Sequence, residues 1–177
     1  DAVLFRLKNL LGVFIAAVLY FVMVYHLSNL YATEHHGVER FILMDGGIYT
    51  NLFWIVQIII GSLLPLAMVY HPTIGKSRPA IATASLLVII GGFAQVYVLL
   101  IGGQAYPLDI FPGYEIVSSS FYEGVVNSYS PSIWEITLGI GGVAVAMLMV
   151  TVAVRVLRFL PETLADDAID PHAAKAD

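Results

Sequence analysis

Four long apolar segments, separated by shorter polar stretches, dominate the hydropathy pattern of the chain. A helix needs about 20 apolar residues to cross the hydrocarbon core of a bilayer, which is about 30 Å thick. Apolar segments of that length cover residues 10–31, 48–70, 79–103 and 132–160. Each is apolar around its whole circumference, which is typical of helices inside a membrane. The pattern therefore predicts an all-α, polytopic membrane helix bundle with four transmembrane helices.

This pattern also predicts the domain organisation. We expect residues 1–160 to form the bundle, with a long loop at residues 104–131 and a tail at residues 161–177. Basic residues near membrane helices favour the cytoplasmic side. They gather at the start of the first segment, between the second and third, and at the end of the fourth: Arg6, Lys8, Lys76, Arg78, Arg155 and Arg158. Both ends of the chain and the tail are then cytoplasmic, and residues 32–47 and 104–131 lie outside. The aromatic residues of the longer loop favour either a belt at the membrane surface or a docking surface.

Composition agrees with a membrane location and excludes several kinds of chemistry. Of 177 residues, 59% are hydrophobic and 12% are charged, and the mean hydropathy is +0.84. The charged fraction is half of the roughly 25% that soluble domains carry. The absence of cysteine excludes disulfides, Fe–S ligation, thiolate zinc sites and covalently attached haem within the chain. No basic patch for nucleic acid, no metal-ligand cluster and no catalytic constellation is visible.

Polar residues within the spans lie mostly in their outer halves. His26, Gln57 and Gln95 lie five, nine and eight residues from the outer ends of three different spans. At 1.5 Å per residue they share roughly the same depth, about 8–14 Å below the outer surface. Their side chains suit a quinone head, which needs hydrogen-bond donors and a proton acceptor beside an apolar cleft. Alternatively, Gln57 and Gln95 bond to each other and only hold two helices together.

Ionisable residues outside the spans suggest a proton path. The first outer loop contains a cluster of ionisable residues, in which imidazoles that titrate near neutral pH can relay protons: His35, His36, Glu39, Arg40 and Asp45. The same residues also suit an ordinary solvated loop with an ion pair. Glu135 follows Ser132 at the capping-box spacing, so it caps the fourth helix, with a proton role as a further option. We take His26, His35, His36, Asp45, Gln57, Gln95 and Glu135 as candidate quinone-binding or proton-path residues.

Two other functions remain as alternatives. Histidines in two spans raise the possibility of a haem-binding cytochrome b subunit. His26 lies near the outer side of the membrane and His71 near the inner side, however, so they cannot be the two axial ligands of one haem within this chain. The other alternative is a non-redox membrane anchor or transporter. A transporter usually places an ionisable pair near the membrane midplane, and the spans contain none.

Several stretches of the chain resemble the NrfD/polysulfide reductase membrane-subunit family. They are EHHGVERFILMDGGIYTNLFW (34–54), GGFAQVYVLLIGGQAYPLDIFPGYE (91–115), YSPSIWEITLGIGG (129–142) and RVLRFLPETLAD (155–166). The last two stretches look typical of the family. The GGQAYPL loop resembles more narrowly the DsrP-like subunits of the Dsr complex, which is associated with sulfite reduction.

The resemblance implies the C-terminal part of an eight- to ten-helix subunit in a prokaryotic cytoplasmic membrane. Such subunits belong to oxidoreductase complexes of anaerobic respiration and sulfur metabolism. They exchange electrons between membrane menaquinone, or another quinone bound transiently, and a ferredoxin-like Fe–S subunit, generally without haem. The better understood quinone pocket of the family is built largely by N-terminal helices. The polar residues found here are then either part of a quinone site or a proton path.

Overall fold

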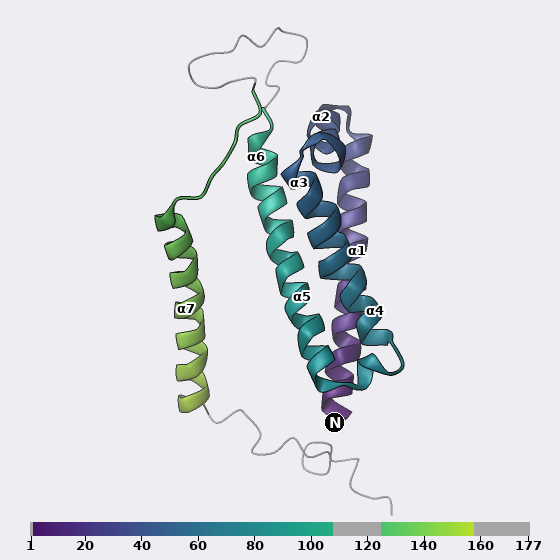
Figure 1. Cartoon of the computed structure of the whole chain (residues 1–177), viewed down its shortest axis with the longest axis vertical. Coiled ribbons are helices and arrows are strands. Elements are labelled where there is room, and N and C mark those ends of the chain that lie inside the picture. The colour runs from purple at the N-terminus through teal and green to yellow at the C-terminus, as the bar shows by residue number, and fades with distance from the viewer. Residues whose placement is uncertain (1, 108–124, 158–177) are drawn as a thin grey trace, which may run out of the picture. The chain divides into compact units, whose positions relative to one another are not determined.

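A computed structural model of the chain describes residues 2–107 and 125–157 (Figure 1). The chain divides into two compact units, one of residues 4–128 and one of residues 1–3 and 129–177. Every regular element of the described residues is helical, which confirms the all-α prediction. In chain order the elements are α1 (Ala2–Tyr31), η1 (Thr33–His35), α2 (His36–Arg40), η2 (Phe41–Asp45), α3 (Ile48–Asn51), η3 (Leu52–Leu63), α4 (Leu64–Tyr70), η4 (Ile74–Lys76), α5 (Arg78–Tyr97), η5 (Val98–Gly102), α6 (Gly103–Ala105) and α7 (Ile133–Val156).

Four helical stretches among the described residues are long and apolar enough to cross a membrane, which confirms the four predicted transmembrane helices. They cover Val3–Tyr31, Ile48–Tyr70, Arg78–Ala105 and Ile133–Val156. The first begins before the predicted residue 10, because helical hydrogen bonding continues through a polar first part that hydropathy excludes. Most of the predicted loop at 104–131 and the whole tail at 161–177 lie outside the described residues. The chain is an integral membrane protein, whereas the packing of all four helices into one bundle stays a prediction.

The second membrane helix changes its hydrogen bonding along its length. It begins as α3, continues as the π-helix η3 and ends as α4. Pro65 lies in the first turn of α4, where it donates no backbone hydrogen bond and crowds the carbonyl of the preceding turn. Within η3 the Ser62 hydroxyl donates to the Gln57 carbonyl at 2.9 Å. Because π-turns occur often at functional sites, the position of Gln57 within η3 draws attention to this part of the helix.

The second and third membrane helices approach each other at two glycines. Gly61 of η3 lies against Gly91 of α5 so closely that a Cβ atom on either residue would overlap the other's backbone. Nearer residues 32–47, buried apolar side chains form a core: Val22, Phe41, Ile42, Tyr49, Phe53, Val98 and Ala105. The core residues come from α1, η2, α3, η3, η5 and α6, so the core joins the loop-end parts of the first three membrane helices to the short helix η2.

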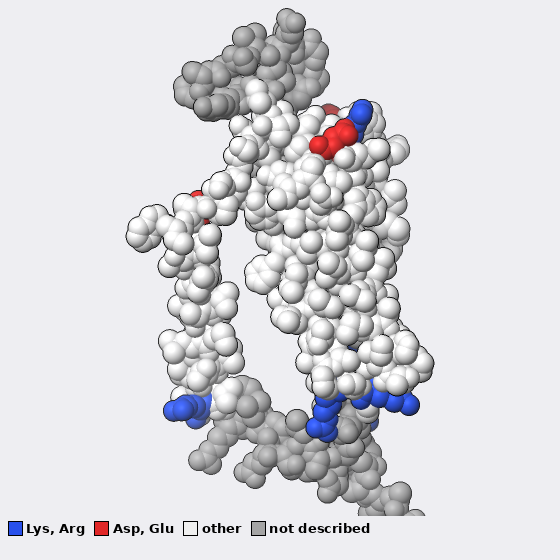
Figure 2. Space-filling view, viewed as in Figure 1, with Lys and Arg blue, Asp and Glu red and all other residues white. Residues whose placement is uncertain are grey.

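Among the described residues of the unit of residues 4–128, charged side chains lie at the two ends of the helices, and the middle shows none in the view of Figure 2. One end carries Arg6, Lys8, Lys76 and Arg78, and we call it the basic end. The other end carries residues 32–47, and we call it the loop end. An uncharged middle between charged ends is the surface expected of a protein that crosses a bilayer.

Helix α7 belongs to the other unit and begins with a capping box. The backbone N–H of Glu135 donates to the Ser132 hydroxyl at 3.3 Å, and the N–H of Ser132 donates to the Glu135 carboxylate at 2.6 Å. The predicted capping role of Glu135 is therefore confirmed. Inside α7, the Thr151 hydroxyl donates to the Met147 carbonyl of its own helix at 2.8 Å.

Candidate functional site

A pocket of about 190 Å³ lies between α1, η3 and α5, in the half of these helices nearer the loop end. The residues that line it share one face of each helix: Phe21, Val22, Tyr25 and His26 from α1, Phe53 and Gln57 from η3, and Gln95, Val98 and Leu99 from α5 and η5. Most of these side chains are apolar or aromatic. The structure thus brings His26, Gln57 and Gln95, which the sequence placed at one depth, to one pocket.

His26 is held by a buried carboxylate that does not line the pocket. Its Nδ1 lies 2.6 Å from Oε2 of Glu39, and the Asn29 amide donates to Oε1 of the same carboxylate at 2.8 Å. His26 and Asn29, the two partners of Glu39, lie three residues apart on α1 and therefore on one face of the helix. The His26 ring also packs edge-to-face on Phe53, with ring centroids 4.8 Å apart. These contacts fix the orientation of the imidazole at the pocket wall.

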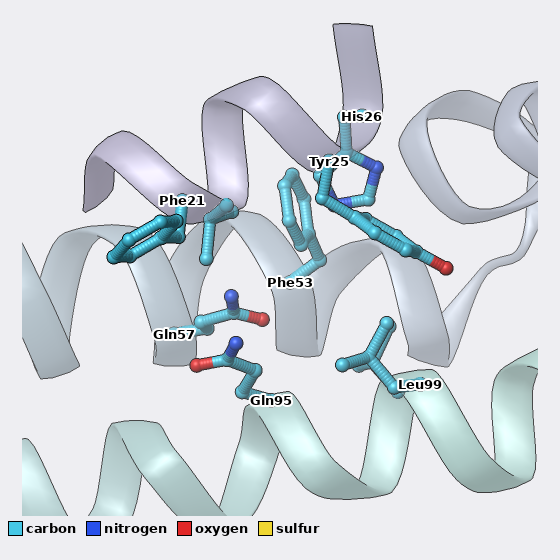
Figure 3. Close-up of a pocket in the computed structure, with 9 residues that line it drawn as sticks. Phe21, Tyr25, His26, Phe53, Gln57, Gln95 and Leu99 are labelled. Carbon is cyan, nitrogen blue, oxygen red and sulfur yellow. The ribbon is translucent and has the colours of Figure 1, made fainter. Parts of the chain in front are cut away.

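The other polar groups of the pocket are two carboxamides. Figure 3 shows the side chains of Gln57 and Gln95 next to each other, with His26 beyond the ring of Phe53. Neither carboxamide has a hydrogen-bond partner among the described residues, so the interpretation that the two only bond to each other is not supported. Gln57 is buried, 4% exposed. A ligand in the pocket would meet free donors and acceptors on both glutamines.

A second pocket, of about 140 Å³, continues from the first towards the basic end. Gln57 and Gln95 line both pockets. The remaining lining residues are small or apolar, apart from Ser62: Leu11, Phe14, Ile15, Val18, Gly61, Ser62, Val88, Gly91 and Gly92. The two pockets together form a cleft with polar groups in the part nearer the loop end and a mainly apolar extension.

The other predicted site residues lie outside the pocket. His35 and His36 are exposed at the loop end, and His36 Nε2 lies 2.6 Å from the Leu30 carbonyl. Asp45 accepts a hydrogen bond from Nε of Arg40 at 2.8 Å, and this pair is exposed. That is the ordinary loop ion pair which the sequence offered as an alternative. Glu135 lies in the other unit, where it caps α7.

The histidines that the structure describes do not form a common haem or metal site. His26 lies near the loop end of α1, whereas His71 follows α4 at the basic end, where its Nδ1 accepts hydrogen bonds from the backbone of Thr73 and Ile74. Within the described residues, no three His, Cys, Asp or Glu side chains lie close enough to share a metal ion.

Sequence reasoning missed the two residues that hold His26. The sequence alone places Glu39 among the ionisable residues of the first loop, and it gives no role to Asn29. A signal for Glu39 exists, because Val38, Phe41 and Ile42 surround it with apolar residues. Glu39 and Ile42 lie three residues apart, and both are almost fully buried. A carboxylate on an apolar face of a short helix points to a buried partner.

Comparison with known proteins agrees with this architecture. The family model of the polysulphide reductase NrfD matches residues 2–107, which is more than half of the chain. The chain belongs to the NrfD family. This confirms the resemblance found in the sequence at the level of the family, while the narrower similarity to DsrP-like subunits stays a prediction.

Three curated relatives are similar over most of the chain. The Hdr-like menaquinol oxidoreductase integral membrane subunit of Archaeoglobus fulgidus is 30% identical over 153 residues, 85% of this chain and 38% of that protein. A putative dimethyl sulfoxide reductase membrane subunit of Halobacterium salinarum is 28% identical, over 92% of this chain and 38% of that protein. A selenate reductase subunit of Mesobacillus selenatarsenatis is 28% identical, over 86% and 35%. The chain thus spans little more than a third of the length of these relatives, and no solved structure shows significant similarity to it.

Proposed function

We propose that this chain is part of the quinone-reactive membrane subunit of a respiratory redox complex. The subunit exchanges electrons between a membrane quinone, menaquinone in the first instance, and a ferredoxin-like Fe–S partner subunit. Membership of the NrfD family supports this role, as does the name of the menaquinol oxidoreductase subunit among the relatives. The similarity to DsrP-like subunits favours a complex of sulfur metabolism.

The observation that carries the proposal is the imidazole of His26 at the wall of a pocket with two free carboxamides. Because Nδ1 faces the Glu39 carboxylate, the carboxylate favours a proton on Nδ1 and leaves Nε2 as the acceptor. Nε2 has no partner among the described residues. It can accept a proton from a quinol hydroxyl, while the amides of Gln57 and Gln95 donate to the carbonyl oxygens of the quinone. The apolar wall suits the ring system.

The second pocket favours a quinone, rather than a small polar molecule, as the ligand of the cleft. A membrane quinone carries an apolar isoprenoid chain, which needs an apolar channel that continues from the site of its head. The pocket lined by Phe14, Val18 and Gly92 continues from the two glutamines and is mainly apolar. Its direction, towards the basic end, would place the isoprenoid chain along the membrane helices.

The location of the subunit follows from the same features. We propose the prokaryotic cytoplasmic membrane, with the basic end and both ends of this chain in the cytoplasm. The loop end with His35, His36 and Asp45 then faces outward, where protons from the pocket reach water. We expect a transiently bound quinone and no haem in this part of the subunit.

The test is quinol oxidation by the complete complex in native membranes. His26→Phe keeps an aromatic ring and removes the acceptor, so it should lower quinol-dependent turnover at least about tenfold, since acid–base groups typically contribute 10²–10⁴. It should also weaken binding of a hydroxyquinoline quinol analogue. The control is Thr151→Val, which removes a hydroxyl that bonds only within α7.

Two outcomes would contradict the proposal. One is an assembled His26→Phe complex with unchanged turnover and unchanged binding of the analogue. The other is a haem b band in the reduced-minus-oxidised spectrum that His26→Phe abolishes, because that would make His26 a haem ligand.

A further inference from the structure

Glu39 is the most deeply buried ionisable side chain among the described residues, with 1% of its surface exposed. Burial of a carboxylate is costly unless its oxygens are hydrogen-bonded and its charge is balanced. Both oxygens are bonded, one to Asn29 and one to His26. Within the described residues, the only group beside it that can become a cation is the imidazole of His26. His26 is therefore the ionisable partner of the buried carboxylate.

The position of His26 relative to Glu39 defines the direction in which a proton would move through the pair. His26 lines the pocket and Glu39 does not, so the imidazole separates the carboxylate from any ligand. Glu39 belongs to α2, which lies at the loop end and begins at the exposed His36, directly after the exposed His35. A proton that enters His26 from the pocket meets Glu39 next, on the side of the loop end.

We propose that Glu39 is the proton-relay residue that carries protons from His26 towards the water at the loop end. This inference rests on the proposed quinone function and assigns a role to a residue that does not contact the quinone. Asn29 is a positioning residue, because its amide holds the second carboxylate oxygen and leaves the first directed at His26.

The step balances in protons and electrons. When a quinol is oxidised, the O–H bond of one hydroxyl breaks and its proton binds Nε2 of His26, while the Nδ1 proton passes to Oε2 of Glu39. The two electrons pass singly to the Fe–S partner. Glu39 releases its proton to the water at the loop end, and the imidazole is restored when its ring turns, so that the protonated nitrogen again faces Glu39 and the unprotonated nitrogen faces the pocket. The second hydroxyl proton then follows the same route.

The experiment compares Glu39→Gln, Glu39→Asp and Glu34→Gln in the complete complex in membranes. Glu39→Gln keeps the shape and a hydrogen-bonding group but cannot accept the proton from Nδ1. We expect its kcat for quinol oxidation to fall at least about tenfold, with the Kd of the hydroxyquinoline analogue changed by less than about threefold. The solvent isotope effect on kcat should rise, because proton transfer becomes rate-limiting. Glu39→Asp should recover part of kcat, and Glu34→Gln, at an exposed glutamate of η1, should match the wild type.

The outcomes distinguish the relay from a structural role and from the proposed function itself. If Glu39→Gln weakens binding of the analogue in proportion to kcat and leaves the isotope effect unchanged, Glu39 only holds the fold and the relay is wrong. If Glu39→Gln has wild-type kcat while His26→Phe abolishes turnover, the quinone site stands and the relay is wrong. If neither variant changes turnover or binding, the proposed function fails as well.

Discussion

Gly91→Ala and Gly92→Ala form a matched pair, because they add the same methyl group at neighbouring positions of α5. A Cβ atom at Gly91 would lie 2.5 Å from the Cα of Gly61, whereas one at Gly92 would meet no atom within 4 Å. Since carbon atoms pack best about 3.5–4.0 Å apart, α5 and η3 must separate by about 1 Å to accept the methyl group at Gly91. Overpacking of this kind typically costs about 1–3 kcal/mol.

Helix propensity does not obscure this difference. Replacing glycine by alanine in a helix gains up to about 1 kcal/mol, and the gain is common to both variants. We therefore expect Gly91→Ala to be less stable than Gly92→Ala by about 1–3 kcal/mol in the free energy of unfolding. Gly92→Ala should equal the wild type or exceed it slightly.

The assay is SDS-induced unfolding of the complete purified subunit, followed by far-UV circular dichroism. Gly61→Ala offers a cross-check, because its Cβ would overlap the backbone of Gly91 from the other side. It should be destabilised by a similar amount. Equal unfolding curves for Gly91→Ala and Gly92→Ala would show that η3 and α5 do not make this close contact. The geometry of the cleft between them would then also be wrong.

Two further predictions concern the cleft and the orientation. Gly92→Leu places a large side chain at the second pocket, so it should raise the KM for a long-chain menaquinol severalfold and leave the KM for a quinol without an isoprenoid chain unchanged. Gly103→Leu is the control, because Gly103 lies outside both pockets. Equal effects of Gly92→Leu on the two quinols would argue against the apolar channel. Single cysteines at the exposed positions Thr33 and Thr73 test the orientation by reaction with a membrane-impermeant thiol reagent added outside intact cells. We expect the cysteine at Thr33 to be labelled and the cysteine at Thr73 to be protected. The reverse pattern would invert the proposed orientation.

The helical architecture was accessible from the sequence because it depends on local properties. A bilayer selects any apolar segment of sufficient length, so hydropathy alone predicts membrane helices. The predicted second span, residues 48–70, coincides with the helix Ile48–Tyr70. The capping box of Ser132 and Glu135 was also predictable, since it joins residues three positions apart. The shared depth of His26, Gln57 and Gln95 followed from simple counting along helices.

Tertiary structure alone decided how these groups pair. The bond between His26 and Glu39 joins residues 13 positions apart across a turn of the chain, and its formation depends on how α2 folds back onto α1. The sequence therefore left Glu39 among the ionisable residues of its loop, although its carboxylate is buried. The contact between Gly61 and Gly91 likewise depends on the rotation of two helices about their axes, which the nearly uniform hydrophobicity of a membrane helix does not specify. Composition determined that the chain enters a membrane, and helix packing determined which of its few polar groups meet.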